Sequence, residues 1–188
     1  MFILYAVLIG LVLGFVLGGR LSGLATFDFR WPWLAIGGFV VQLVLFSDPL
    51  RERIGDMGAP LYVASTVLVL IAVIRNIRIP GMALVAVGAA SNLAAIVANG
   101  GYMPASEGAF AALGGGLNPG YTNSAIVANP ALEPLTDLFA LPAWLPFANV
   151  FSIGDVLIAM GVVIVIVAGM RRAPGAAPHA SDRFTADS

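Results

Sequence analysis

The 188-residue chain contains no cysteine and no lysine, and only 10% of its residues are charged. Without cysteine, the chain has no disulfide scaffold, no thiolate metal site and no cysteine nucleophile. Nine arginines stand against ten acidic residues, and a net charge of -1 leaves no basic surface of the kind that binds phosphate backbones. Nucleic-acid binding and thiol chemistry are therefore excluded.

Histidine is nearly absent as well. The one histidine, His179, lies in the final segment 173–188, which is small, polar and proline-rich. Such a segment has too little apolar surface to offset the entropy of ordering, so we predict a disordered cytoplasmic tail. Because the outer side offers no cysteine, no histidine and few clustered acids, we expect no metal site and no cofactor.

Apolar residues make up 60% of the chain, against about 45–50% in an ordinary soluble domain. They form long uncharged runs, and a membrane-spanning helix needs ~20 such residues. The sequence therefore predicts an all-α fold, a polytopic transmembrane helical bundle in one domain, residues 1–172. The five predicted spans lie near residues 1–19, 31–47, 57–74, 79–99 and 153–170. Gln42 interrupts the second run, so four spans are the alternative.

The arginines predict the orientation of these spans. Positive residues in short loops are retained on the cytoplasmic side of a membrane. Arginines follow the first, third and fifth runs, at Arg20, Arg30, Arg75, Arg78, Arg171 and Arg172. The opposite side has only Arg51 and Arg53, interleaved with acids. We therefore expect the amino terminus outside and the carboxyl terminus in the cytoplasm.

Three glycines, Gly10, Gly14 and Gly18, lie four residues apart on one face of the first predicted span. This spacing lets two helix backbones approach closely in a bilayer, where lipid provides no hydrophobic drive for association. The partner of this face is either another helix of the chain or a second copy of the protein.

The segment 100–150 is rich in glycine, proline and asparagine. Its backbone cannot lie bare in lipid, because each unpaired polar group would cost several kcal/mol there. We predict that it folds as an extracytoplasmic cap over the helices. Residues 105–113 are expected to form a short interfacial helix. The run GGGLNPG lacks the lysine and hydroxyl residue of a phosphate-binding loop and is interpreted as a turn.

Asp155 stands directly before the last uncharged apolar run. Only fifteen residues separate it from Arg171, and they span roughly 22 Å as a helix, against a hydrocarbon core of about 30 Å. Asp155 is therefore expected below the outer membrane surface, where a carboxylate is a functional candidate. The alternative is a capping role, because Ser152 and Asp155 form the S-x-x-D pattern of a helix start.

Asp137 lies 18 residues earlier, and the apolar segment between the two acids contains Pro142 and Pro146. If this segment dips to the membrane interface and returns, the two carboxyl groups meet. Two carboxyl groups in one pocket of low dielectric share a proton, and they can act as base and acid on a water molecule. We therefore predict Asp137 and Asp155 as a catalytic pair. A solvated loop acid is the alternative for Asp137.

Other polar residues lie near these acids in the sequence or on the predicted helices. Asn92 and Asn99 share one helix face, and Asn149 precedes the Ser152 cap. We predict that these four residues orient a substrate. The alternative for the amides is hydrogen bonding between helices.

The turn GGRLS after the first run, NGGYMP after the fourth and NVFSIGDVLIAMG at the last resemble a family of small bacterial integral membrane proteins whose defining domain has no assigned function. The resemblance covers nearly the whole chain. It implies a multi-pass protein of the bacterial cytoplasmic (inner) membrane.

The segment 137–164 also resembles the end of signal peptidase II, the lipoprotein signal peptidase. In that family an Asp in an apolar context precedes an F-N-x-A-D motif that opens the last helix, and FSIGD at 151–155 occupies the place of that motif. The resemblance implies that Asp137 and Asp155 activate water against a peptide bond at the outer membrane face.

Three classes of activity remain open. The most concrete is an aspartate-pair membrane peptidase or hydrolase. The second is a non-enzymatic membrane subunit or assembly factor that binds a membrane protein or lipoprotein partner, or a second copy through Gly10, Gly14 and Gly18. The third is a small transporter or lipid-binding protein, although few charges lie within the predicted spans to form an ion path.

Overall fold

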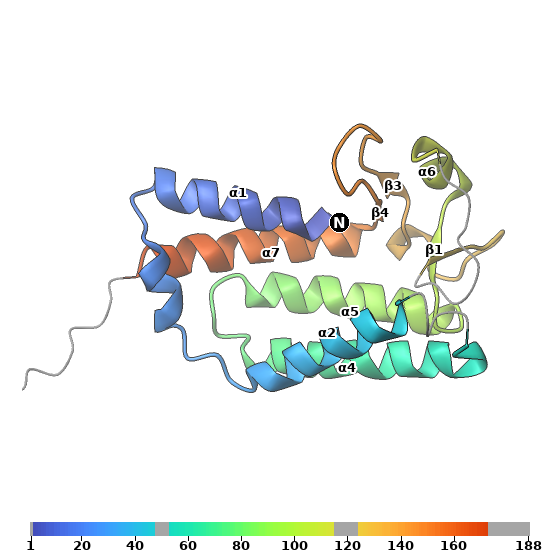
Figure 1. Cartoon of the computed structure of the whole chain (residues 1–188), viewed down its shortest axis with the longest axis horizontal. Helices are drawn as coiled ribbons and strands as arrows, with labels where there is room; N and C mark the ends of the chain where they lie inside the picture. The colour runs from blue at the N-terminus through green and yellow to red at the C-terminus, as the bar shows by residue number, and fades with distance from the viewer. Residues whose placement is uncertain (1, 48–52, 115–123, 173–188) are drawn as a thin grey trace, which may run out of the picture.

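The computed structural model describes residues 2–47, 53–114 and 124–172. The predicted tail 173–188 and most of the GGGLNPG turn lie outside these residues. Within them, five apolar helices form a bundle (Figure 1). They are α1 (Phe2–Val16), α2 (Pro32–Leu45), α4 (Gly58–Arg75), α5 (Met82–Ala98) and α7 (Ile153–Met170), with 3-10 turns at Leu21–Thr26 and Gly55–Met57.

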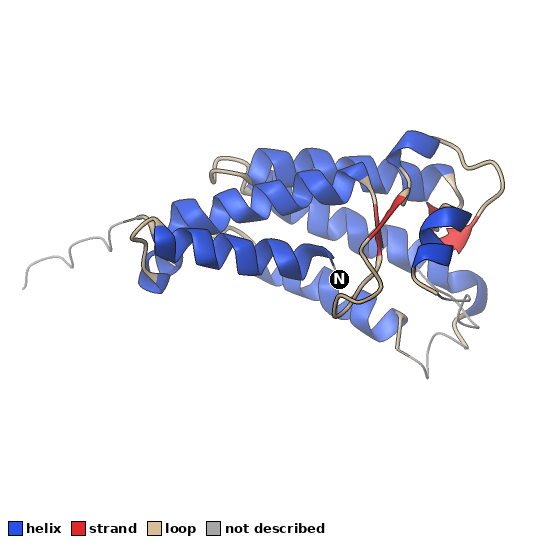
Figure 2. Cartoon of the chain, turned by 90° about the horizontal axis from the view of Figure 1, so that it is seen from above, coloured by secondary structure: helices blue, strands red, loops and turns tan. Residues whose placement is uncertain are grey.

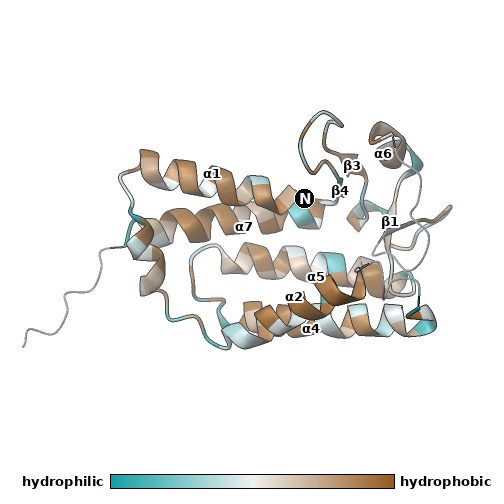
Figure 3. Ribbon diagram, in the orientation of Figure 1, coloured by the Kyte–Doolittle hydropathy of each residue, from teal (hydrophilic) through white to brown (hydrophobic). Residues whose placement is uncertain are grey.

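The helices differ in their capacity to cross a membrane. Among the described residues, Gly55–Arg75 and Ile153–Met170 are long and apolar enough to span one. The helices α1, α2 and α5 are also apolar but have only 15, 14 and 17 residues. Figure 3 shows that apolar residues predominate along these helices. The chain is thus mostly helical with two candidate spans, and the five predicted spans stay a prediction.

The prediction of an all-α fold needs a correction at the cap, which gathers at one end of the bundle and contains short strands (Figure 2). Strand β1 (Met103–Ala105) pairs in parallel with β2 (Ser124–Ile126), and β3 (Phe139–Ala140) pairs antiparallel with β4 (Val150–Phe151). The cap also holds α6 (Glu107–Ala112) and a 3-10 turn, Glu133–Leu135. A segment rich in proline and glycine cannot form long helices, so its backbone groups pair between short strands instead.

Glycines allow α7 to approach its two neighbours closely. On the α5 side, a Cβ atom built at Gly88 would lie 2.9 Å from the backbone N of Ile158, and one built at Gly161 would lie 2.7 Å from the carbonyl of Gly81. Real Cβ atoms essentially never come this close, so the two backbones need glycine at these positions. Helix α7 therefore lies in van der Waals contact with the α5 backbone.

The glycine face of the first helix contacts α7 of the same chain. Gly10 packs against Ile166, and Gly14 packs against Met170. Gly18 lies beyond α1, in a turn with φ of +77°, and a Cβ atom there would meet nothing within 4 Å. Two of the three glycines thus serve packing within the chain, while self-association through this face stays an untested prediction.

We expect that Gly88→Ala lowers the thermal unfolding midpoint of the protein in detergent. Alanine in a helix interior is favoured over glycine by about 1 kcal/mol, but forcing an extra methyl group into a packed contact costs about 1–3 kcal/mol. Gly37→Ala is the matched control, because Gly37 lies in α2 with open space around it. The control midpoint should stay equal or rise. If both variants behave alike, the close contact of α5 and α7 is not limiting for stability.

Candidate functional site

The candidate site is built around the amino-terminal end of α7. Ser152 caps this helix, and its Oγ accepts a hydrogen bond from the backbone N–H of Asp155 at 3.0 Å. In return, the backbone N–H of Ser152 donates to Asp155 Oδ2 at 3.1 Å. This reciprocal capping box satisfies two N–H groups that a helix start leaves without partners. The S-x-x-D pattern is therefore realised in the fold.

Asn92 of α5 extends the capping box into a network between two helices. Its Nδ2 donates to Asp155 Oδ1 at 2.8 Å, and its Oδ1 accepts from Ser152 Oγ at 2.8 Å. The amide can reach both residues because Gly154 has no side chain, and a Cβ atom there would collide with the Asn92 amide. Asn92 and Ser152 thus fix the orientation of the Asp155 carboxylate.

Asp137 reaches the same region from the cap. Its backbone N–H donates to the carbonyl of Pro104 at 2.9 Å, and its carbonyl accepts from the N–H of Ser106 at 3.0 Å. These bonds place Asp137 beside β1, and its side chain is only 6% exposed. Burial and, to a lesser extent, the nearby charge of Asp155 together raise the pKa of Asp137 from 3.8 to about 7.

The two acids therefore interact electrostatically although different parts of the fold carry them. Asp137 lies in the cap and Asp155 in the first turn of α7. Because desolvation and the neighbouring Asp155 both disfavour the charged form of Asp137, this carboxyl keeps its proton up to about pH 7. A carboxylic acid beside a carboxylate can donate one proton and accept another.

The remaining predicted substrate-orienting residues make their hydrogen bonds elsewhere. Asn99 ends α5, and its Nδ2 donates to the carbonyls of Ala95 and Ala131, while its Oδ1 accepts from the N–H of Ala131. It thereby fastens the cap to the end of the helix. Asn149 lies in the loop between β3 and β4, where its Nδ2 donates to the carbonyl of Val150. Its Oδ1 is buried and has no hydrogen-bond partner.

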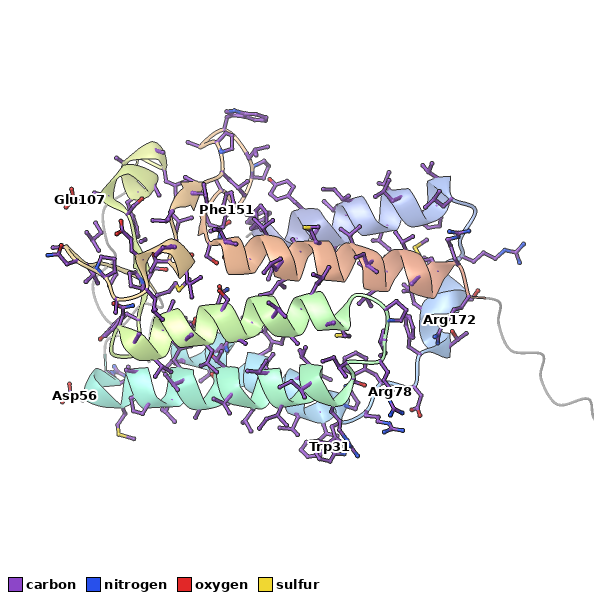
Figure 4. All side chains as sticks on the ribbon, turned by 180° about the vertical axis from the view of Figure 1, so that it is seen from behind. Trp31, Asp56, Arg78, Glu107, Phe151 and Arg172 are labelled. Atoms are coloured by element: carbon purple, nitrogen blue, oxygen red, sulfur yellow. The ribbon has the colours of Figure 1, made fainter. Side chains whose placement is uncertain are left out.

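An aromatic stack beside the site was not anticipated from the sequence. The Phe151 ring stacks on Phe2 of α1 with centroids 4.3 Å apart and on Phe139 of β3 at 5.5 Å. Figure 4 shows Phe151 where the cap meets the start of α7. The hydroxyl of Tyr5 donates to the carbonyl of Pro146 at 2.6 Å, so α1 also holds the hairpin loop. The spacing of these residues along the chain carries no signal, because three separate segments supply them.

The comparisons with known proteins identify a family without an assigned activity. A family model described as a family of unknown function (DUF5317) matches residues 26–167, which include both acids and Asn92. An uncharacterized protein of Thermotoga maritima is 30% identical over 178 residues, which cover 93% of this chain and 96% of that protein. No solved structure matches.

These matches confirm the predicted resemblance to a family whose domain has no assigned function. They offer no support for the second resemblance, to signal peptidase II. Any hydrolytic role of the two acids therefore rests on the geometry of this chain alone.

The raised pKa of Asp137 predicts a pH dependence of stability. Between about pH 4 and pH 7 the unfolded chain ionises this carboxyl while the folded protein keeps it protonated, so the free energy of unfolding falls as pH rises and levels off above pH 7. The loss amounts to at most about 4 kcal/mol. Asp137→Asn removes this dependence, because the amide stays neutral at every pH.

Thermal unfolding midpoints in detergent, measured from about pH 4 to about pH 8, test this expectation. As pH rises, the unfolding midpoint of the parent protein should fall relative to that of Asp137→Asn. Asp56→Asn is the control, since Asp56 is an exposed acid at the end of the bundle that carries the cap (Figure 4). A parallel pH profile for all three proteins would contradict a buried, protonated Asp137.

Proposed function

The chain belongs to the family of unknown function DUF5317, and we propose that it is a multi-pass membrane protein whose Asp137–Asp155 pair hydrolyses a peptide bond of a membrane-associated substrate. The observation that carries this proposal is the buried Asp137, whose pKa rises to about 7 through burial and the charge of Asp155. Perturbed carboxyl pairs of this kind are characteristic of acid–base catalysis.

The exposed surface of the helices supports placement in a bilayer. Large apolar side chains face outward along α1 and α2, among them Val16 at 75% exposure and Leu43 at 72%. Soluble proteins rarely expose contiguous apolar faces of this extent. At 1.5 Å per residue the three shorter helices reach roughly 21–26 Å, and a bilayer accommodates such lengths by local thinning. We therefore propose that all five helices span the membrane.

The distribution of charge supports the proposed orientation. Arg78 and Arg172 lie at one end of the bundle, and Asp56 and Glu107 lie at the other, with the cap (Figure 4). By the positive-inside rule, the arginine end faces the cytoplasm and the cap faces outward. The amino terminus is then outside, and the carboxyl terminus is cytoplasmic.

The proposed reaction uses each acid in one role. Asp155 accepts a proton from a water molecule while the water oxygen bonds to the substrate carbonyl carbon. Asp137 donates its proton to the amide nitrogen as the carbon–nitrogen bond breaks, which yields a carboxylic acid and an amine. Asn92 and Ser152 act as positioning residues, because their hydrogen bonds hold the Asp155 carboxylate.

A second candidate function is binding of a protein partner without catalysis. It is favoured by the loop between β3 and β4, where Trp144 is 81% exposed and Phe147 is 71% exposed. Exposed aromatic residues are common anchors of interfaces. On this interpretation the acids serve only to dock the cap on α7.

The absence of cysteine makes the orientation directly testable. We expect Ala143→Cys in the cap to react with a membrane-impermeant maleimide in intact spheroplasts. Ser22→Cys, in the turn after α1, should react only after the membrane is permeabilised. Both positions are exposed in the fold. Equal labelling of both before permeabilisation would contradict the proposed topology.

Asp137→Asn and Asp155→Asn should each abolish hydrolysis, with a loss of at least about 10³-fold, because neither acid can replace the other. The measurement is a comparison of peptide amino termini in membranes of cells that produce the parent or a variant protein at equal levels. Peptide termini that depend on the activity should disappear in both variants and persist in Asp56→Asn.

Two outcomes would contradict catalysis. If the sets of peptide termini are identical in the parent and the variants, the pair is not a peptidase site. If the variants lose the folded protein instead, the acids act in cap docking, which favours the partner-binding function.

A further inference from the structure

Three arginines converge on one pocket at the end of the bundle opposite the cap. The pocket has a volume of about 380 Å³ and is lined by Arg30, Arg75 and Arg78 together with Ile71, Ile74 and Ile77. All three arginines are exposed, so the pocket is accessible from outside the protein. It therefore combines an apolar wall with three positive charges.

A buried asparagine holds the backbone of Arg30 at this pocket. Asn76, which ends α4, is only 3% exposed. Its Oδ1 accepts from the backbone N–H of Arg30 at 2.7 Å, and its Nδ2 donates to the carbonyl of Arg30 at 2.7 Å. Another bond, to the carbonyl of Ala72, holds the amide in place. This pairing brings Arg30 next to Arg75 and Arg78, which lie more than 40 residues away in the chain.

An aromatic side chain positions the second arginine. The guanidinium of Arg75 lies 5.1 Å from the ring centroid of Trp31, in cation–π contact. Trp31 is 44% exposed and Trp33 is 65% exposed, and tryptophan is enriched at the level of lipid headgroups. Figure 4 shows Trp31 and Arg78 near each other at this end of the bundle.

The lining of the pocket, as far as the structure describes it, contains no acidic side chain. Among the residues that the structure describes, no carboxylate pairs with Arg30, Arg75 or Arg78. Three guanidinium groups in one pocket repel one another, and an anion that contacts all three removes this repulsion. Guanidinium groups match phosphate oxygens in geometry and bind them through charge-assisted hydrogen bonds.

Resting on the membrane placement proposed above, we infer that the Arg30–Arg75–Arg78 pocket binds the phosphate headgroup of an anionic phospholipid in the cytoplasmic leaflet. The isoleucine wall favours a lipid over a free phosphate, because its residues Ile71 and Ile74 are also exposed on the apolar surface of α4. An acyl chain can lie along this face while the phosphate contacts the arginines. Basic pockets at the cytoplasmic ends of helices are typical lipid-headgroup sites.

Native mass spectrometry of the purified full-length protein tests this inference. The protein in mild detergent is titrated with phosphatidylglycerol, with phosphatidylcholine and with inorganic phosphate. The variant Arg30→Gln/Arg78→Gln removes two charges from the pocket but leaves Arg75 on Trp31. Its matched control, Arg20→Gln/Arg171→Gln, removes two exposed charges from the same end of the bundle outside this pocket.

We expect the parent protein to bind phosphatidylglycerol in preference to phosphatidylcholine. The pocket variant should lose at least about tenfold in affinity for phosphatidylglycerol, since it lacks two charge-assisted contacts. The control should lose less than about threefold. Equal losses in the two variants would overturn the inference in favour of general surface charge. Displacement of the lipid by inorganic phosphate would overturn it in favour of a free-anion site.

Two further measurements keep the outcome interpretable. Arg78→Gln alone serves as the milder variant if the double variant does not fold, and the thermal midpoint of each protein reports folding. Extraction of cell membranes with alkaline carbonate tests the membrane placement separately. A protein that resists extraction but shows no lipid preference would refute the pocket and leave the placement intact, whereas a protein that is extracted would refute the placement itself.

Discussion

The close approach of α5 and α7 is the constraint on which the candidate site depends. A Cβ atom at Gly154 would lie 2.8 Å from the Gly88 carbonyl and 2.8 Å from Cγ of Asn92. Only with glycine at both positions can the Asn92 amide reach Ser152 and Asp155. Glycine contacts of this kind provide helix association in an apolar solvent, where burial of apolar surface contributes little.

The site also depends on how the cap lies on the bundle. Asp137 is placed by backbone hydrogen bonds to β1, and Asn99 fastens the cap to the end of α5. Docking of the cap desolvates Asp137 beside a second carboxyl, and desolvation raises its pKa. The folded protein therefore keeps a proton on Asp137 at pH values below about 7. The same arrangement suits acid–base chemistry, or docking of the cap on α7 without catalysis.

The sequence predicts those features of the site that involve neighbouring residues, but not the contacts between residues far apart in the chain. The S-x-x-D pattern indicated the capping box of Ser152 and Asp155, because such a motif acts within one helical turn. Asn92 was recognised as a polar residue in a helix, but its partners lie 60 and 63 residues away. The Phe2–Phe151–Phe139 stack and the short strands of the cap depend equally on contacts between distant segments.

Composition and periodicity by themselves determined that this is a mostly helical chain with apolar helices, few charges and a glycine- and proline-rich cap. These properties follow from local hydrophobicity and backbone propensity, which every residue carries in any fold. Only the tertiary structure decided that Asp137 is buried and that Asn76 draws Arg30 toward Arg75 and Arg78. Burial and electrostatic coupling are properties of neighbours in space, and the chain acquires those neighbours only when it folds.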